Sequence, residues 1–356
     1  MKESIYAGLV ARRILLLVGL LITLVLGMLY SVTLGFAEIS IADVYGLILQ
    51  KLTGIGDRQY SILSAGIILQ IRLPRVFLAI IAGISLGTNG AIMQSLLKNP
   101  LASPYTLGIS SGAACGAAVA IVAGNSLFGS TNMLHWDSWL TIIGAFAMGL
   151  LTILLINIIA SLKKSGASTL ILAGVALSYL FSAGISFFKY IADHEQLQQL
   201  TLWLMGGLYR AEWLDVLLLT PIMGLAVLYI LRRAWDINAL NAGEEVAANL
   251  GINVQRLRKQ GSIVAAFLTS VVVAFTGIIG FIGLVAPHIS RMIVGNDNRF
   301  LILASGLTGG IFLLLADTAA RIIIDPVELP VGIITALCGA PFFLYMLLKR
   351  RREYWS

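Results

Sequence analysis

Long apolar runs alternate along the chain with short polar stretches. A helix that crosses the hydrocarbon core of a bilayer needs about 20 apolar residues, and it must satisfy its backbone polar groups within itself. Runs of this length, or nearly so, cover residues 14–34, 74–96, 105–124, 139–161, 169–190, 213–231, 261–283, 284–295, 300–320 and 331–348. The pattern therefore predicts an all-α, polytopic membrane protein of about ten transmembrane helices, folded as a single transmembrane domain over residues 1–356.

Composition supports this class and excludes an ordinary soluble domain. Hydrophobic residues make up 58% of the 356 residues and charged residues only 12%, whereas soluble domains carry roughly 25% charged residues. The net charge of +7 does not indicate a nucleic-acid partner, because the basic residues gather at the ends of apolar runs. Cys115 and Cys338 lie far apart in the sequence, and no Cys/His spacing is typical of a metal site.

The basic residues also predict the orientation, because loops rich in Lys and Arg stay on the cytoplasmic side. With the N-terminus inside, the cytoplasmic segments are 1–13, 97–104, 162–168, 232–260, 291–299 and 349–356. They hold seventeen of the 24 basic residues, namely Lys2, Arg12, Arg13, Lys98, Lys163, Lys164, Arg232, Arg233, Arg256, Arg258, Lys259, Arg291, Arg299, Lys349, Arg350, Arg351 and Arg352. Both termini are therefore predicted to be cytoplasmic, in a multi-pass protein of the cell membrane.

Residues 232–260 form the one long cytoplasmic segment. Within it, the stretch AGEEVAANLGI (242–252) predicts a short helix. Glu244 and Glu245 fall in its first turn, where acidic side chains suit the positive end of the helix dipole. Gly251 follows as a natural C-cap. The apolar residues of this helix offer a small surface that a protein partner could cover; the alternative is a solvated connector.

Several strings of the chain resemble, in order, those of the FecCD family, the permeases of ATP-binding-cassette (ABC) importers for iron-siderophore, cobalamin and haem. Besides LNAGEEVAANLGINVQRLRK in the cytoplasmic segment, they are QIRLPRVFLAIIAG (70–83), MQSLLKNPLASPYTLGISSGA (93–113), LILAGVAL (170–177), WLMGGL (203–208), GIIGFIGLVAPHISRMIVG (277–295), LLADTAAR (314–321) and ELPVGIITALCGAPFFLYMLL (328–348). The resemblance runs from about residue 70 to the C-terminus, whereas residues 1–69 match only in hydropathy.

The resemblance implies that residues 232–260 couple the chain to a separate ATPase. The residues that we expect at this contact are Gly243, Glu244, Glu245, Ala247, Leu250 and Gly251. The family further implies a homodimer with two ATPase subunits, a pathway near the fifth and tenth helices, and an external substrate-binding protein. The substrate would be an iron chelate (siderophore), haem or cobalamin, and an oxyanion is also left open.

Arg72 and Arg75 flank Leu73-Pro74 on the side opposite to the cytoplasm, where arginines break the charge asymmetry. Before the resemblance, the choice lies between lipid headgroups and an acidic group of the same chain. The family instead implies that Arg72, Arg75 and Arg321 meet acidic residues of the binding protein. Charge-assisted pairs of this kind steer docking.

An inner gate is implied at two cytoplasmic places. One includes Asn99 and Leu101 in the Asn-Pro-Leu-Ala string, and the other includes Ser168 and Thr169 at the start of the fifth run. Irregular backbone is tolerated at membrane depth only against protein or a wet cavity. Ordinary turn chemistry explains Asn-Pro equally well and stays an alternative.

Residues that carry chemistry are few. His288 in GLVAPHISR is expected to be structural, and Asp317 to form a local ion pair with Arg321 four residues later. No Walker A string GxxxxGK[ST] is present, so the chain itself is expected to be no enzyme, with no catalytic residue, metal or bound cofactor; ATP and Mg would lie on the partner ATPase. An ion-driven secondary transporter is the alternative, but the centres of the runs carry almost no charge to couple to ions.

Overall fold

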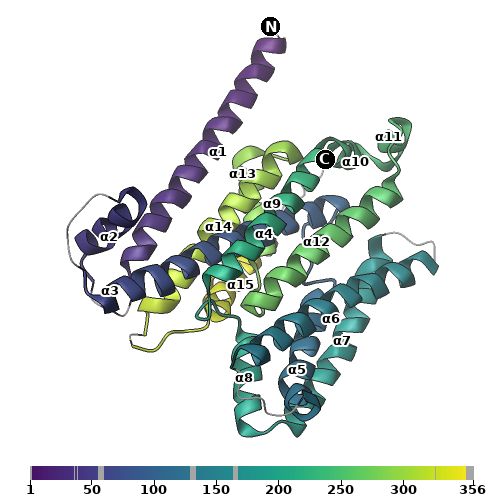
Figure 1. Cartoon of the computed structure of the whole chain (residues 1–356). Coiled ribbons are helices and arrows are strands. Elements are labelled where there is room, and N and C mark those ends of the chain that lie inside the picture. Colours follow the sequence, from purple (N-terminus) through teal and green to yellow (C-terminus); the bar gives the residue numbers. More distant parts are fainter. Residues whose placement is uncertain are drawn as a thin grey trace.

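The computed structural model describes residues 2–35, 37, 39–54, 60–128, 134–162, 167–324 and 326–349, and this part of the chain contains helices and no strands (Figure 1). The helices are α1 (Lys2–Thr33), α2 (Ile41–Thr53), α3 (Ile62–Gly66), η1 (Ile67–Arg72), α4 (Leu73–Leu96), α5 (Ile109–Phe128), α6 (Leu134–Leu162), α7 (Ala167–Ile191), α8 (His194–Met205), α9 (Trp213–Arg232), α10 (Ala234–Ala242), α11 (Glu244–Asn249), α12 (Val254–Thr276), α13 (Ile282–Val294), α14 (Asn298–Ile322) and α15 (Val331–Lys349). The predicted all-α class is confirmed.

Each predicted run coincides at least partly with a helix. Within the described ranges, seven helical stretches are long and apolar enough to cross a membrane: α1, the continuous stretch from α3 to α4, α6, α7, α9, α12 and α14. Three shorter apolar helices, α5, α13 and α15, match the runs 105–124, 284–295 and 331–348. The protein is thus a multi-pass membrane protein, while the number of ten crossings stays a prediction.

The run 261–283 is displaced from its helix at both ends. Helix α12 begins earlier, at Val254, and ends at Thr276. Gly277 then adopts a φ of +66°, and Phe281 a φ of +67° that non-glycine residues rarely take. Hydropathy cannot detect this break, because GIIGF is as apolar as a helix core.

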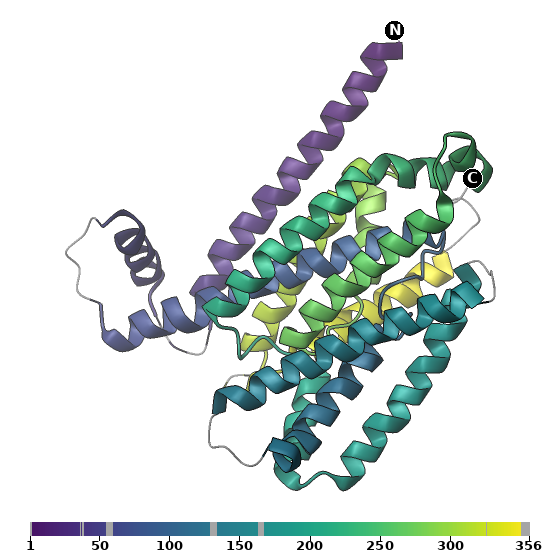
Figure 2. The same cartoon turned by 45° about the vertical axis from the view of Figure 1, so that its right-hand side comes forward.

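Helix α4 lies at the centre of the bundle, packed against α1, α9, α12, α13 and α14 (Figures 1 and 2). Nearly every residue from Pro74 to Leu96 is buried. Glycines allow this close approach: a Cβ on Gly90 would overlap the backbone of Gly283 in α13, and one on Gly83 would overlap that of Gly309 in α14. Small residues at such crossings let membrane helices pack closely by van der Waals contact.

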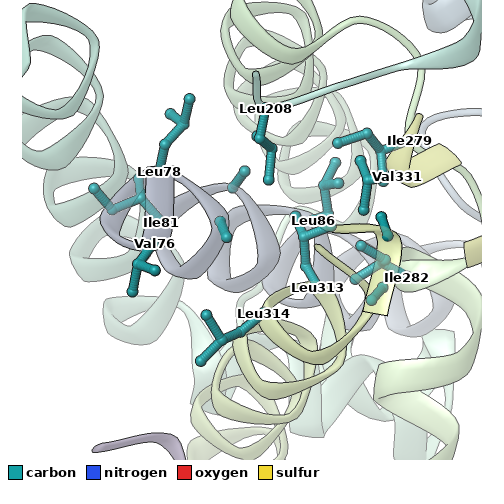
Figure 3. Close-up of a cluster of buried hydrophobic side chains, with 14 of the residues drawn as sticks. Val76, Leu78, Ile81, Leu86, Leu208, Ile279, Ile282, Leu313, Leu314 and Val331 are labelled. Atoms are coloured by element: carbon teal, nitrogen blue, oxygen red, sulfur yellow. The ribbon is translucent and has the colours of Figure 1, made fainter. Parts of the chain in front are cut away.

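A large hydrophobic cluster joins the other helices to α4. It includes Val76 and Leu86 of α4, Ile282 of α13, and Leu313 of α14 (Figure 3). Ile279, from the loop after α12, is fully buried in the same cluster. The irregular segment between α12 and α13 is therefore held inside the protein, where its backbone is shielded from lipid.

The fold gathers the predicted cytoplasmic segments at one end of the bundle, here called the basic end. Arg13 of α1 contacts Asp297 before α14, Asn238 of α10 contacts the same turn, and Arg258 of α12 contacts the last turn of α4. The opposite end carries α2, α3 and α8. The segments 1–13, 232–260 and 291–299 thus lie together, next to the last turn of α4. The order of crossings and the cytoplasmic location of the termini stay predictions.

Candidate functional site

The segment between α9 and α12 forms two short helices at the basic end. Helix α10 buries Ala234, Ile237 and Leu240 against the bundle. Gly243 separates it from α11 with a φ of +148°, a conformation that side-chain-bearing residues rarely adopt. The chain can therefore reverse direction at Gly243 and place α11 at the edge of the protein (Figure 1).

One side of helix α11 packs against the rest of the chain, and the other side is exposed. Ala247 is completely buried, whereas Val246 and Leu250 are 45% and 67% exposed. Glu245 in the first turn is also exposed. Gly251 closes the helix in the left-handed region with a φ of +79°, and its N–H donates to the Ala248 carbonyl. The predicted short helix is thus present over Glu244–Asn249, with Leu250 as its C-cap and Gly251 as the left-handed residue that follows.

Two of the residues named for the ATPase contact behave differently from the rest. Ala247 is completely buried against its own chain in this structure. Glu244 is already engaged by Arg258 within the chain. Val246, which the sequence did not single out, joins Leu250 as the exposed apolar tip of α11. The Glu244 side chain is still 55% exposed, and the ATPase contact of Gly243, Glu244, Glu245, Ala247, Leu250 and Gly251 stays a prediction, with Val246 as a further exposed candidate.

Arg258 connects three elements at this place. Its guanidinium donates to Glu244 at the start of α11 and, through Nε, to the Leu96 carbonyl of α4 at 3.1 Å. The hydrogen bond from Arg258 lowers the pKa of the Glu244 carboxyl, and the charges of Arg258 and Lys98 act in the same direction. Arg258 thus links α11 to the central helix α4.

The three arginines predicted to face a binding protein lie inside the chain. Arg72, Arg75 and Arg321 are only 4–5% exposed. Arg72 donates to the carbonyls of Val32 and Thr33 in the last turn of α1 and of Ala37 after it. In this structure all three arginines bond to their own chain, and Arg75 meets acidic groups of that chain, as the intrachain alternative proposed. Their role in docking a binding protein stays a prediction.

Arg75 and Arg321 share one buried carboxylate. Arg75 Nε lies 2.9 Å from Asp317 Oδ1, and Arg75 Nη1 lies 2.6 Å from Glu328 Oε2. Arg321 Nε is 3.2 Å from Asp317 Oδ2, an ion pair without hydrogen-bond geometry, and its Nη2 donates to Ser31 Oγ at 2.7 Å. The predicted local pair of Asp317 and Arg321 is present, and Glu328 is a partner that the sequence did not reveal.

The two predicted gate segments lie side by side at the basic end. Leu97 and Ala102 share a hydrophobic cluster with Leu170 and Ala173 of α7. Asn99 Oδ1 accepts from the Leu101 N–H at 2.9 Å. Asn99 thus stabilises the turn after α4, as the alternative of ordinary turn chemistry expects. Thr169 is half-buried in the first turn of α7, and the side chain of Ser168 lies outside the described residues. A gating role stays a prediction.

The remaining residues of interest have structural surroundings. The His288 ring packs edge-on against Phe342 of α15, with 6.3 Å between the ring centroids. Within the described ranges, His, Cys, Asp and Glu residues form no group of three or more that could hold a metal ion. The expectations about cofactors and metals stay predictions.

Comparisons with known proteins agree with this arrangement. The FecCD transport family matches residues 22–349. The chain is 44% identical over 344 residues to a candidate ABC transporter permease of Methanocaldococcus jannaschii, covering 95% of each. It is 38% identical over 339 residues to the hemin transport system permease of Yersinia pestis, covering 95% of this chain and 97% of that protein. A solved inward-facing structure of a candidate metal-chelate type ABC transporter superposes with a TM-score of 0.79 at 31% identity, covering 94% of this chain and 99% of that one.

Proposed function

The chain belongs to the FecCD transport family, and from this premise we propose that it is the membrane-spanning permease subunit of an ABC importer. Its substrate would be an iron chelate, haem or cobalamin. Relatives named for hemin, for cobalamin in Halobacterium salinarum and for Fe(3+)-citrate in Bacillus subtilis support this range of substrates. All are large chelates that a separate binding protein could deliver to the opposite end.

The observation that carries the proposal is the exposed tip of α11. Val246 and Leu250 are apolar side chains in water at the basic end, beside the acidic Glu245. Apolar residues rimmed by charge on a rigidly held helix are typical of a protein contact. Arg258 and the buried Ala247 fix the other side of α11. A partner ATPase that binds this tip could therefore displace α11 as a rigid body.

The transport unit would be a homodimer with two ATPase subunits. Helix α7 is only 22% buried over its apolar window, and α15 also exposes large apolar side chains. The most exposed are Leu172, Tyr179, Leu180 and Tyr190 of α7, and Leu337, Leu344, Tyr345 and Leu348 of α15. Pairing of these faces across a two-fold axis would enclose the pathway. ATP-driven closure would then switch it between outward- and inward-facing states.

Docking of the binding protein would involve the opposite end. Arg75 is covered there by Glu328, whose side chain is 40% exposed. A carboxylate of the binding protein could replace Glu328 on Arg75, because both would make the same charge-assisted hydrogen bond. This exchange would let a buried arginine take part in docking without moving α4.

The proposal is tested by co-purification of the tagged chain with an ABC ATPase co-expressed from the same organism. Leu250→Asp places a charge on the exposed tip, and we expect it to lower the recovered ATPase at least about tenfold, as for the loss of an anchoring contact. Asn249→Asp is the matched control, since Asn249 is exposed on the same helix. Equal recovery of the ATPase with both variants would contradict this role of α11.

A further inference from the structure

The turn between α13 and α14 holds an unusually connected carboxylate. Asp297 precedes α14 and accepts from the Arg299 N–H, as an N-cap residue does. Its oxygens also accept from Arg13 of α1 at 3.1 Å and from the amide of Asn238 in α10 at 2.9 Å. One side chain therefore joins α1, α10 and α14, which is more than capping requires.

Asn298 extends this connection into the central helix. It is completely buried, and its N–H and its Nδ2 both donate to Asn238 Oδ1 at 2.9 Å. Its own Oδ1 accepts from Ser95 Oγ of α4, also at 2.9 Å. A continuous path of hydrogen bonds thus runs from α10 through the start of α14 to α4.

A second contact reinforces the path between α10 and α14. The Arg299 guanidinium carbon lies 4.2 Å from the centroid of the Trp235 ring, within cation–π distance. Arg299 also pairs with Asp297. The start of α14 is consequently bound to α10 by directional hydrogen bonds and by ring contact, rather than by apolar packing that would let the two slide.

Two sets of polar contacts connect residues 232–260, here called the coupling segment, to α4, and they end at neighbouring residues of that helix. Arg258 carries one from α11 to the Leu96 carbonyl, and Asn298 carries the other from α10 to Ser95. Since α4 packs against α1, α9, α12, α13 and α14, a displacement delivered to its last turn reaches the whole bundle.

From this geometry we infer that the α13–α14 turn is a mechanical link, here called the latch, that transmits movement of the coupling segment to α4 and α14. Asn238, Asp297 and Asn298 are its positioning residues, and Ser95 is its contact on α4. The inference rests on the proposed function, because a partner ATPase must supply the movement. Burial raises the pKa of Asp297, but hydrogen bonds from Arg299 and Asn238 outweigh burial and hold the pKa at about 2. The Asp297 carboxylate therefore stays charged at physiological pH.

The test measures transport and ATP hydrolysis in the same proteoliposomes, which contain the chain with its co-purified ATPase and have a binding protein for the probe on the outside. The probes are haemin, cyanocobalamin and ferric citrate, and the one that the wild type takes up is used for the variants. We expect Asn298→Ala to retain the ATPase and its hydrolysis rate within about twofold, while uptake per ATP falls at least fivefold, on the order of a typical coupling between sites.

A milder variant keeps the test decisive if Asn298→Ala does not fold. Ser95→Ala removes one hydrogen bond, and we expect uptake per ATP to fall about two- to threefold. Ser262→Ala is the matched control, because Ser262 is equally buried but bonds only to its own helix, at the Lys259 carbonyl; it should keep the wild-type ratio.

The outcomes separate the latch from the proposed function. An unchanged ratio in Ser95→Ala and Asn298→Ala would overturn the latch alone, and so would a parallel fall of uptake and hydrolysis, which indicates general damage. Wild-type vesicles without any ATP-driven uptake would overturn the proposed function and the latch with it.

Discussion

At the scale of single residues, the buried charges at the opposite end are the most constrained feature of the molecule. Asp317 has no exposed surface and lies between Arg75 and Arg321. Removal of one partner from a buried ion pair leaves the others unpaired, at a cost of about 3–5 kcal/mol. We therefore expect Asp317→Asn to lower the thermal unfolding temperature in detergent strongly.

Glu328→Gln is the control for this prediction. Glu328 pairs with the same Arg75, but its side chain is 40% exposed, so water screens the interaction and its loss should cost no more than about 1 kcal/mol. A larger effect for Glu328→Gln than for Asp317→Asn would show that the cluster is not organised around Asp317.

The latch carboxylate gives a prediction for pH. Asp297 has a pKa of about 2 in the folded chain, below the ordinary 3.8, so its ionised form is favoured by folding and its contribution is complete above about pH 4. Compared with Asp297→Asn, the wild type should unfold at a higher temperature by a constant margin between pH 8 and 5. The margin should shrink as the pH falls from 4 towards 2. A margin that already narrows between pH 8 and 6 would contradict the described network.

Single residues also show what the sequence can and cannot predict. Asp317 and Arg321 lie four residues apart on one helix, so their pairing follows from helix geometry alone. Arg75 and Asp317 are separated by 242 positions, and nothing in a single sequence relates them. For this reason the sequence left open whether Arg75 meets lipid headgroups, an acid of its own chain or a binding protein.

At the scale of elements, hydropathy predicts where helices are but not what the chain does between them. The runs of α4, α7, α9 and α14 match their helices closely, and the charge and glycine pattern of residues 242–252 predicts α11. Helix α2, by contrast, lies within residues 1–69, where the sequence strings did not reveal the resemblance that the family model finds from residue 22 onward. The break after α12 depends on two positive φ angles. The helix ends there because of the backbone conformation of single residues, which hydropathy does not record.

Close helix crossing gives the prediction for this scale. In Gly90→Ala the added methyl would overlap the Gly283 backbone of α13. Because backbone cannot yield as a side chain does, we expect a destabilisation of about 1–3 kcal/mol, measured as a lower unfolding temperature. Gly19→Ala is the control, since nothing lies within 4 Å of that position. Equal behaviour of the two variants would contradict the packing of α4 on α13.

At the scale of the whole molecule, the two ends of the bundle predict an orientation in the membrane. Leu250 at the basic end is 67% exposed and Leu63 at the opposite end is 75% exposed. In a chain whose Cys115 and Cys338 have been replaced by alanine, Leu63→Cys should react with a membrane-impermeant maleimide in intact spheroplasts. Leu250→Cys should react only after permeabilisation. The reverse result would invert the topology and remove α11 from the reach of an ATPase.

The most direct test of the central claim is uptake into proteoliposomes that contain the chain with or without its partner ATPase. With a binding protein and haemin, cyanocobalamin or ferric citrate outside, we predict uptake of at least one probe that requires both the ATPase and ATP in the compartment facing the basic end. Uptake by the chain alone, driven by an imposed proton or sodium gradient without ATP, would contradict the importer and identify a secondary transporter instead.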